Sequence, residues 1–240
     1  MLSAVRSGQR RNTVILPADY NEAMRKLPSL LKVSVSLLAL FALCTMSLAA
    51  KDFAKPAAQP AKTYPAHDDH PAEGVAVAAD PYDMPDKAQI FSVNYRDAGF
   101  LPIFLVVTND SNSAVSLADM EVQMNTASRA KLTPLSSDDI YRRLTNPSTT
   151  TPLPLPIPRK KVKGTLSQKE KDEIENAQFA AKLVEPHSTQ SGFLFFDVSG
   201  ISAPLAGAHL YLTGLKDTKG NELMYFEIAL EKYLSAPQKP

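Results

Sequence analysis

The sequence lacks tryptophan and has a single cysteine and nine glycines, against 19 prolines in 240 residues. One cysteine cannot form an intramolecular disulfide, which excludes the class of small disulfide-stabilised secreted domains. The formal net charge is +1, so the chain also lacks the basic excess with which proteins bind nucleic acid. We therefore expect no nucleic-acid partner and an ordinary hydrophobic core.

Motifs for common enzyme chemistry are missing as well. The chain has no Gly-rich phosphate loop, no Walker pattern, no dinucleotide fingerprint and no G-x-S-x-G elbow. Asp138 and Asp139 are adjacent carboxylates, but their place at the predicted start of a helix is explained by capping and the helix dipole. We predict that the protein is not an enzyme and that it uses no cofactor.

What the chain does contain is one uncharged apolar segment, residues 33–50 (VSVSLLALFALCTMSLAA). It follows Arg25, Lys26 and Lys32 and ends in small residues around Ala49. A basic flank, an apolar run and an A-x-A-like exit together form a secretory signal. We predict a signal peptide over residues 24–49, with Met24 as the true start and cleavage before Ala50.

Three points about this segment stay open. Residues 1–23 are either an incorrectly assigned start or a cytoplasmic flank. The segment can also be retained as an N-terminal anchor, because about 18 to 20 apolar residues just cross a bilayer. Lipidation of Cys44 is disfavoured by the bulky Leu43 before it. If the signal is cleaved, the mature chain has no cysteine.

Residues 50–87 are rich in Ala, Pro, Lys and Asp and show no apolar periodicity. Such a segment cannot bury enough surface to offset its ordering entropy. We predict a disordered linker there. The linker contains two imidazoles and two carboxylates in a row, His67, Asp68, Asp69 and His70, which are weak candidates for binding Zn²⁺ or Cu²⁺.

Residues 88–234 carry the pattern of a mainly β domain. Strands are predicted over 89–95, 101–108, 117–126, 192–198, 208–213 and 223–230. The strand 101–108 is apolar on both faces and should be central. In 208–213, His209 alternates with Tyr211 and Thr213 on the wetter face. His187 lies in a predicted loop, and a hairpin loop is expected over 216–221.

Two helices interrupt this pattern. Ser136 or Ser137 can cap a short helix over 138–144. Ser167 and Glu170 form a capping box that opens a helix over 167–183. The prediction is an immunoglobulin-like antiparallel β-sandwich with an inserted helical part, preceded by the signal helix and the linker and followed by a tail at 235–240.

Three runs carry a family resemblance: GFLPIFLVVTNDSNSAVSLADMEVQM, PHSTQSGFLFFDV and GNELMYFEIALEKYL. With them, residues 88–234 resemble a family of uncharacterised exported bacterial proteins with an immunoglobulin-like sandwich. The shared motifs are structural. The resemblance implies a fold and a compartment, and it brings no activity, ligand or site residue.

A Pro-rich arm occupies residues 146–164. Its prolines alternate with Leu153, Leu155 and Ile157, which an extended chain places on one face, and its basic end follows: Arg159, Lys160, Lys161 and Lys163. The arm either packs on its own domain, stays an exposed loop, or docks on a partner.

Together these features predict an exported, non-enzymatic module of the cell envelope, periplasmic or secreted. Its partner would be an envelope protein or surface, and it would meet the membrane only through an uncleaved N-terminal segment. One alternative is an exported metal-handling protein that uses His67 and His70. Another is a sandwich-fold hydrolase, which would need a pocket with His187 or His209 beside a carboxylate.

Overall fold

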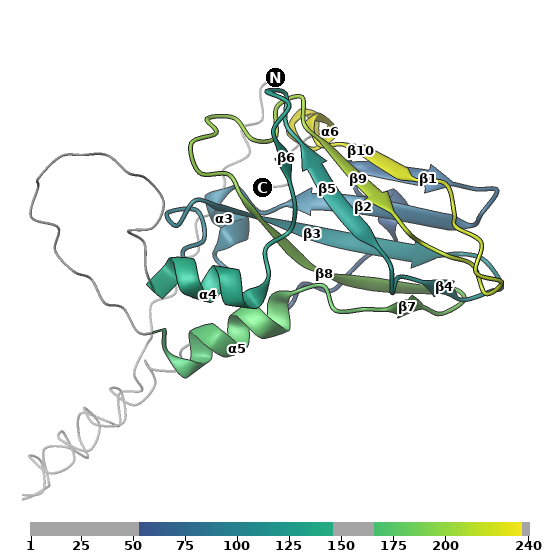
Figure 1. Ribbon diagram of the computed structural model, residues 1–240, viewed down its shortest axis with the longest axis horizontal. Helices are drawn as coiled ribbons and strands as arrows, with labels where there is room; N and C mark the ends of the chain where they lie inside the picture. The colour runs from purple at the N-terminus through teal and green to yellow at the C-terminus, as the bar shows by residue number, and fades with distance from the viewer. Residues whose placement is uncertain (1–52, 146–165, 237–240) are drawn as a thin grey trace, which may run out of the picture. The chain divides into compact units, whose positions relative to one another are not determined.

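The computed structural model describes residues 53–145 and 166–236, which belong to one compact unit that begins at Asp52. This part of the chain is mainly β and contains two four-stranded antiparallel sheets that face each other (Figure 1). The first sheet has the order β1 (His67–His70), β2 (Val75–Pro81), β3 (Phe100–Asn109) and β8 (Ser188–Asp197). The second has the order β10 (Phe226–Ala229), β9 (His209–Thr213), β5 (Glu121–Asn125) and β6 (Lys131–Leu132).

The remaining elements are short. The strands β4 (Val115–Ser116) and β7 (Leu183–Val184) pair with each other. The helices are η2 (Ala61–Thr63), α3 (Pro85–Ala88), α4 (Ser137–Thr145), α5 (Gln168–Ala177) and α6 (Glu231–Ser235).

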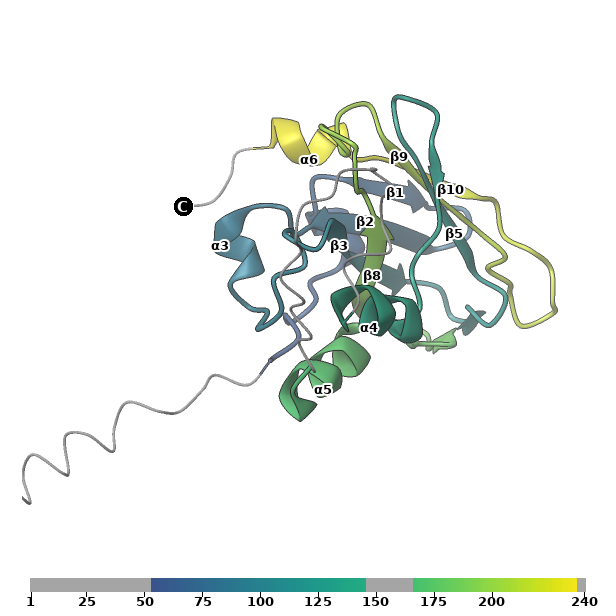
Figure 2. The same cartoon turned by 60° about the vertical axis from the view of Figure 1, so that its left-hand side comes forward.

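The strand β3 is buried along its whole length and separates two hydrophobic cores. Leu105 and its alternating neighbours face the second sheet and contribute to the core between the sheets. Phe104 and Val106 point the other way, into a core that also contains Ile140 of α4 and Ile174 of α5. The helices α4 and α5 cover the outer face of the first sheet (Figure 2), so the central strands of that sheet are buried on both faces. The prediction of a central, doubly apolar strand over 101–108 is confirmed.

Several further predictions are confirmed. The strands predicted over 117–126, 192–198, 208–213 and 223–230 correspond to β5, β8, β9 and β10, with bounds that differ by a few residues. Ser136 Oγ accepts from the Asp139 N–H and caps α4. The Ser167–Glu170 capping box opens α5. The loop between Lys216 and Asn221 turns at Gly220, where φ is 82°.

The prediction of a disordered linker over 50–87 is wrong, because β1, β2 and η2 lie within it. In β2 the five residues from Val75 to Ala79 are at most 1% exposed. A strand buried on both faces shows no alternation of apolar and polar residues. The alanines of β2, Ala76, Ala78 and Ala79, are therefore core residues that allow close packing, and they gave no periodic signal.

The prediction of a strand over 89–95 is also wrong. After α3, these residues form turns, and the N–H groups of Ser92 and Val93 donate to the buried Glu173 carboxylate of α5 at 2.6 and 3.2 Å. The rings of Phe91 and Tyr95 pack on Phe195 of the first sheet. This apolar stretch thus covers a sheet without joining it.

The helix predicted over 167–183 ends earlier, at Ala177. Gln178 has extended backbone angles, and the Phe179 N–H donates to the Phe193 carbonyl of β8 at 3.0 Å. Pairing with the edge of β8 therefore replaces the last predicted turns of the helix.

Candidate binding site

The motif at residues 67–70 is β1, and strand geometry divides it between two faces. Side chains in a strand alternate, so His67 and Asp69 lie on one face and Asp68 and His70 on the other. On the first face, Asp69 pairs with Lys62 at 3.2 Å, and His67 Nδ1 lies 2.6 Å from the Tyr64 carbonyl oxygen. In the described residues, no group of three or more His, Cys, Asp or Glu side chains could hold a metal ion. His67 and His70 are not brought together.

The other face of β1 contacts the edge of the second sheet. Asp68 Oδ2 accepts from the backbone N–H of Glu227 in β10 at 2.9 Å, and Glu73 Oε1 accepts from the Met224 N–H at 2.9 Å. An edge strand exposes unpaired N–H groups. Asp68 satisfies such a group in β10, and Glu73 satisfies the N–H of Met224 just before that strand. We call this arrangement the carboxylate clasp.

His70 lies inside the carboxylate clasp. Its Nε2 is 3.4 Å from Asp68 Oδ2, and its Nδ1 is 3.1 Å from Glu73 Oε2. The imidazole stacks on the buried ring of Phe226, with centroids 4.1 Å apart and planes 14° apart. The motif at residues 67–70, a weak metal-binding candidate from the sequence, thus contacts the edge of the second sheet through Asp68 and His70.

Outward-pointing residues of β10, β9 and β5 form the outer face of the second sheet. Inward residues such as Leu210 and Leu212 are fully buried, which places His209, Tyr211 and Thr213 outside. The prediction that these three lie on the wetter face is confirmed. The strand register places Glu227, Tyr211 and Gln123 in one row across the three strands.

Two hollows lie on this outer face. A hollow of about 370 Å³ is lined by Asp68, His70, His209, Met224, Tyr225, Glu227 and Ala229. Another of about 620 Å³ is lined by Glu121, Val122, Gln123, Asn125, Thr133, Tyr211 and Thr213. Tyr211 connects the two, because its hydroxyl donates to Glu227 Oε1 at 2.7 Å. We call the surface formed by both hollows the acidic face.

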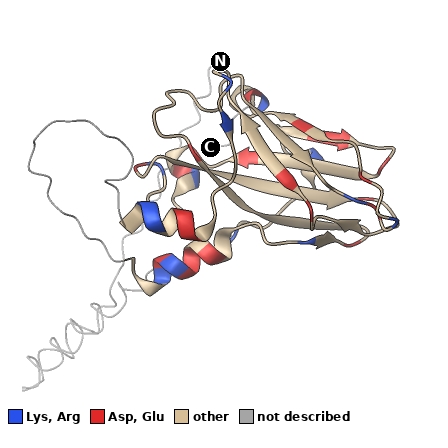
Figure 3. Cartoon of the chain, in the orientation of Figure 1, with Lys and Arg blue, Asp and Glu red and all other residues tan. Residues whose placement is uncertain are grey.

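Carboxylates and aromatic rings dominate the acidic face. Its charged lining residues are Asp68, Glu121 and Glu227, and neither hollow is lined by a described Lys or Arg. Figure 3 shows acidic residues on β1, β10 and β5, and a basic residue on β6. That residue is Lys131, which pairs with Asn125 at the far end of the face.

Hydrogen bonding changes the acidity of this surface. The hydrogen bond to the Glu227 carboxylate, assisted by partial desolvation, raises the pKa of Tyr211 above its ordinary value. His209 Nδ1 lies 2.9 Å from the same Glu227 oxygen. The Glu227 carboxylate therefore accepts the Tyr211 hydroxyl and lies next to the His209 imidazole.

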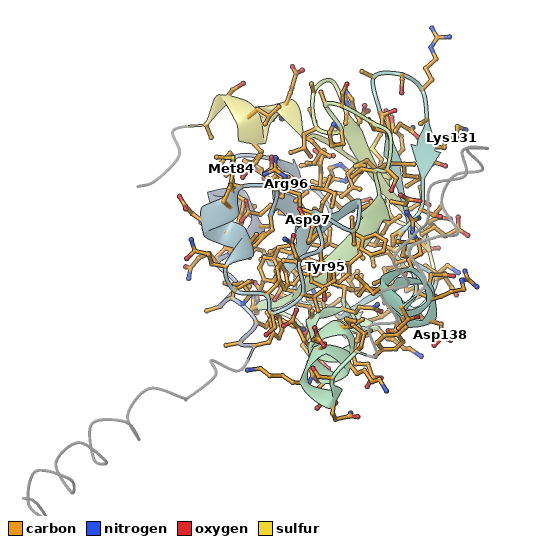
Figure 4. All side chains as sticks on the ribbon, turned by 90° about the vertical axis from the view of Figure 1, so that its left-hand side faces the viewer. Met84, Tyr95, Arg96, Asp97, Lys131 and Asp138 are labelled. Atoms are coloured by element: carbon orange, nitrogen blue, oxygen red, sulfur yellow. The ribbon has the colours of Figure 1, made fainter. Side chains whose placement is uncertain are left out.

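Two other hollows, of about 330 and 440 Å³, flank Tyr82, Asp83 and Arg96 at one end of the sandwich. Figure 4 shows Tyr95, Arg96 and Asp97 grouped there, with Lys131 on the opposite side of the view. Burial, and then the nearby Glu173 carboxylate, raise the pKa of the Tyr95 hydroxyl. The loop is held to α5 by the N–H groups of Ser92 and Val93, which donate to Glu173.

The other histidine and the acidic pair noted in the sequence lie apart from the acidic face. His187 is in a loop with φ of 53°, and its Nε2 is 3.1 Å from Asn112 Oδ1. Asp138 and Asp139 open α4, where Asp139 accepts from the capping Ser136 hydroxyl at 2.7 Å. This agrees with their assignment to helix capping.

The arm residues Leu153, Leu155, Ile157, Arg159, Lys160, Lys161 and Lys163 lie outside the described residues, as do the predicted signal and Cys44. Their roles stay predictions. The sequence did not predict that Asp68, Tyr225 and Glu227 are neighbours, because Asp68 and Glu227 are 159 positions apart in the chain. The alternation over 208–213 was the one signal of the acidic face.

No protein-family model matches the chain, and no curated protein matches it. Within residues 53–145 and 166–236, no helix combines the length and the apolar character needed to cross a membrane.

Proposed function

We propose that this protein is an exported, non-enzymatic β-sandwich module of the cell envelope and that it binds a partner through the acidic face. The apolar segment at 33–50 with its basic flank supports export. The partner would be a protein or surface of the same compartment.

We further propose that the sandwich is immunoglobulin-like. In that fold one sheet contains strands A, B, E and D, and the other contains C, F and G. The orders β2-β3-β8 and β10-β9-β5 agree with A-B-E and G-F-C. The segment that holds α4 and α5 lies between β6 and β7 in the chain, where strand D would be expected, and β1 is an addition at the edge.

One observation carries the binding role. Met224 and Tyr225 are 65% and 50% exposed, and they are the two most exposed large hydrophobic residues of the described chain. They are adjacent and both line the hollow beside Glu227. Tyrosine and methionine are enriched at protein interfaces, and exposed apolar groups rimmed by polar ones mark interaction sites.

Site-specific photo-crosslinking tests this proposal. A photoreactive phenylalanine analogue replaces Tyr225 in the full chain, and in a matched protein it replaces the exposed Asn176 of α5, on the opposite side of the sandwich. We expect a discrete crosslinked species from position 225 in intact cells and none from position 176. Equal labelling from both positions would contradict a binding role for the acidic face.

Export is tested separately. Residues 1–52 fused to a reporter that is active only outside the cytoplasm should give activity, and Leu38→Arg within the apolar segment should abolish it. Reporter activity that is absent from both fusions would refute export. The size of the mature protein then distinguishes a cleaved signal from a retained anchor.

A further inference from the structure

The chemistry of the acidic face also indicates what kind of ligand it takes. We propose, building on the proposed binding role, that the acidic face binds a Lys- or Arg-bearing segment of a partner protein, with a cationic side chain seated between Tyr225 and the carboxylates of Glu227 and Asp68.

Charge complementarity is the first step. Three carboxylates line the two hollows, and no described Lys or Arg lines either of them. Asp68 and Glu227 both lie in the smaller hollow, where the Asp68 carboxylate accepts the Glu227 N–H at 2.9 Å. Two carboxylates that line one hollow create a negative potential there that a cation relieves.

Aromatic geometry is the second step. The ring centroids of Tyr211 and Tyr225 are 6.5 Å apart, and their planes are 36° apart. Tyr225 is half exposed, so its ring has an accessible surface beside the carboxylates. An ammonium or guanidinium within about 6 Å of a tyrosine ring centroid is attracted by the ring quadrupole. Rings and carboxylates together recognise an organic cation better than a neutral ligand.

The shape of the face is the third step. Both hollows are open and follow the strands β10, β9 and β5, which span about 10 Å at the usual spacing between strands. A short extended segment can cross this width. Lys131 lies at the β6 end of the face. A cationic segment would be attracted by the carboxylates near β10 and repelled by Lys131 near β6, so the two ends of the face are not equivalent.

The test is fluorescence anisotropy with labelled probes on the purified chain lacking the predicted signal. The probes are a peptide of about eight residues that alternates Lys or Arg with Ala, the same peptide with Gln at each basic position, and a neutral oligosaccharide. We expect the basic peptide alone to bind. A rise in salt from about 0.05 to 0.5 M should weaken that binding, because these charges are exposed.

Variants locate the site. Tyr225→Ala and Glu227→Gln should each weaken binding about three- to fivefold, whereas Tyr225→Phe keeps the ring and should retain it. The matched control Glu175→Gln removes a carboxylate from α5 on the other side and should have no effect. Lys131→Gln should leave binding unchanged or strengthen it. Thermal unfolding of each variant separates lost binding from lost structure.

Any of three results would overturn the proposal. The first is that the Gln peptide binds as tightly as the basic one, and the second is that the oligosaccharide binds in place of the basic peptide. The third is that Glu175→Gln weakens binding as much as Glu227→Gln. If no basic peptide binds while position 225 still crosslinks a partner, the ligand class is wrong and the binding role stands. If position 225 crosslinks nothing in cells, the binding role itself fails.

Discussion

Gly192 in β8 lies where the segment after α5 approaches the strand closely. A Cβ atom at this position would be 2.4 Å from the Cα of Phe179 and 2.7 Å from its backbone nitrogen. The neighbour is backbone, whose N–H is fixed by its hydrogen bond to Phe193. Only glycine lets the segment after α5 pair with β8.

We therefore expect Gly192→Ala to lower the free energy of unfolding by at least about 2 kcal/mol, because the strand or the segment after α5 must shift. Urea denaturation followed by circular dichroism measures this. The neighbouring Ser191→Ala serves as control and should cost less than about 0.5 kcal/mol. Equal stability of the two variants would show that the close approach is easily relaxed.

The pair of Arg143 and Asp197 links α4 to β8. Burial alone would raise the pKa of Asp197, but hydrogen bonds from Arg143 and Ser199 outweigh it and hold that pKa below the ordinary 3.8. A carboxyl group with a lowered folded-state pKa stabilises the fold above its unfolded-state pKa. That stabilisation is lost as the pH falls through the folded-state value.

This gives a pH-dependent prediction. As the pH falls from about 5 to 2.5, the unfolding free energy of the unaltered protein should decrease more than that of the Asp197→Asn variant. The two free energies should therefore converge at low pH. The difference should stay below about 1 kcal/mol, because the pair is partly exposed to solvent. Parallel pH profiles from urea denaturation would refute this role of the pair.

Among the elements, β10 depends on the carboxylate clasp at its free edge. The doubly substituted Asp68→Asn, Glu73→Gln protein keeps the size of both side chains but removes both charges. Charge-assisted hydrogen bonds are stronger than neutral ones, so we expect a loss of about 1 to 2 kcal/mol in total.

Hydrogen exchange locates this loss. The amides of Met224 and Glu227 should exchange faster in the double variant, while the amides of β3 keep their protection relative to global unfolding. Unchanged exchange at Met224 and Glu227 would show that the clasp does not protect the edge of β10.

The helix α5 begins with the reciprocal capping box of Ser167 and Glu170. Ser167→Ala removes the acceptor for the Glu170 N–H and should cost about 1 kcal/mol. Ser167→Asp, which restores an acceptor, should recover most of it. Thermal unfolding measures both, and a loss shared equally by the two variants would argue against capping as the cause.

Whether a strand could be predicted from the sequence depended on whether one or both of its faces are buried. The strands β5, β9 and β10 have one wet face, and their alternation made them visible in the sequence. In β2 both faces are buried, so Ala76 and Ala78 looked like part of a flexible tract. Residues 89–95 had the apolar pattern of a strand, but the N–H groups of Ser92 and Val93 donate to Glu173, which is 80 positions away from Val93.

The acidic face could not be predicted as a site, because it needs partners that are distant in sequence. The alternation of His209, Tyr211 and Thr213 indicated an outer face, but nothing local places Asp68 beside Glu227. The cluster at residues 67–70 attracted a metal hypothesis through composition, and strand alternation then separated its histidines.

For the whole molecule, the N-terminal strands are part of the fold. We expect a chain that begins at Lys51 to unfold cooperatively in urea. A chain that begins at Ala88 lacks β1 and β2, which leaves one edge of β3 and part of both cores exposed. It should show no cooperative transition by circular dichroism. Cooperative folding of the shorter chain would restore the interpretation of residues 50–87 as a linker.

The carboxylate clasp also sets the order of events during folding. Its two contacts join residues 151 and 159 positions apart, Glu73 with Met224 and Asp68 with Glu227. Contacts between such distant residues form late, because a long loop must close first. The sandwich therefore cannot close until nearly the whole chain has been synthesised.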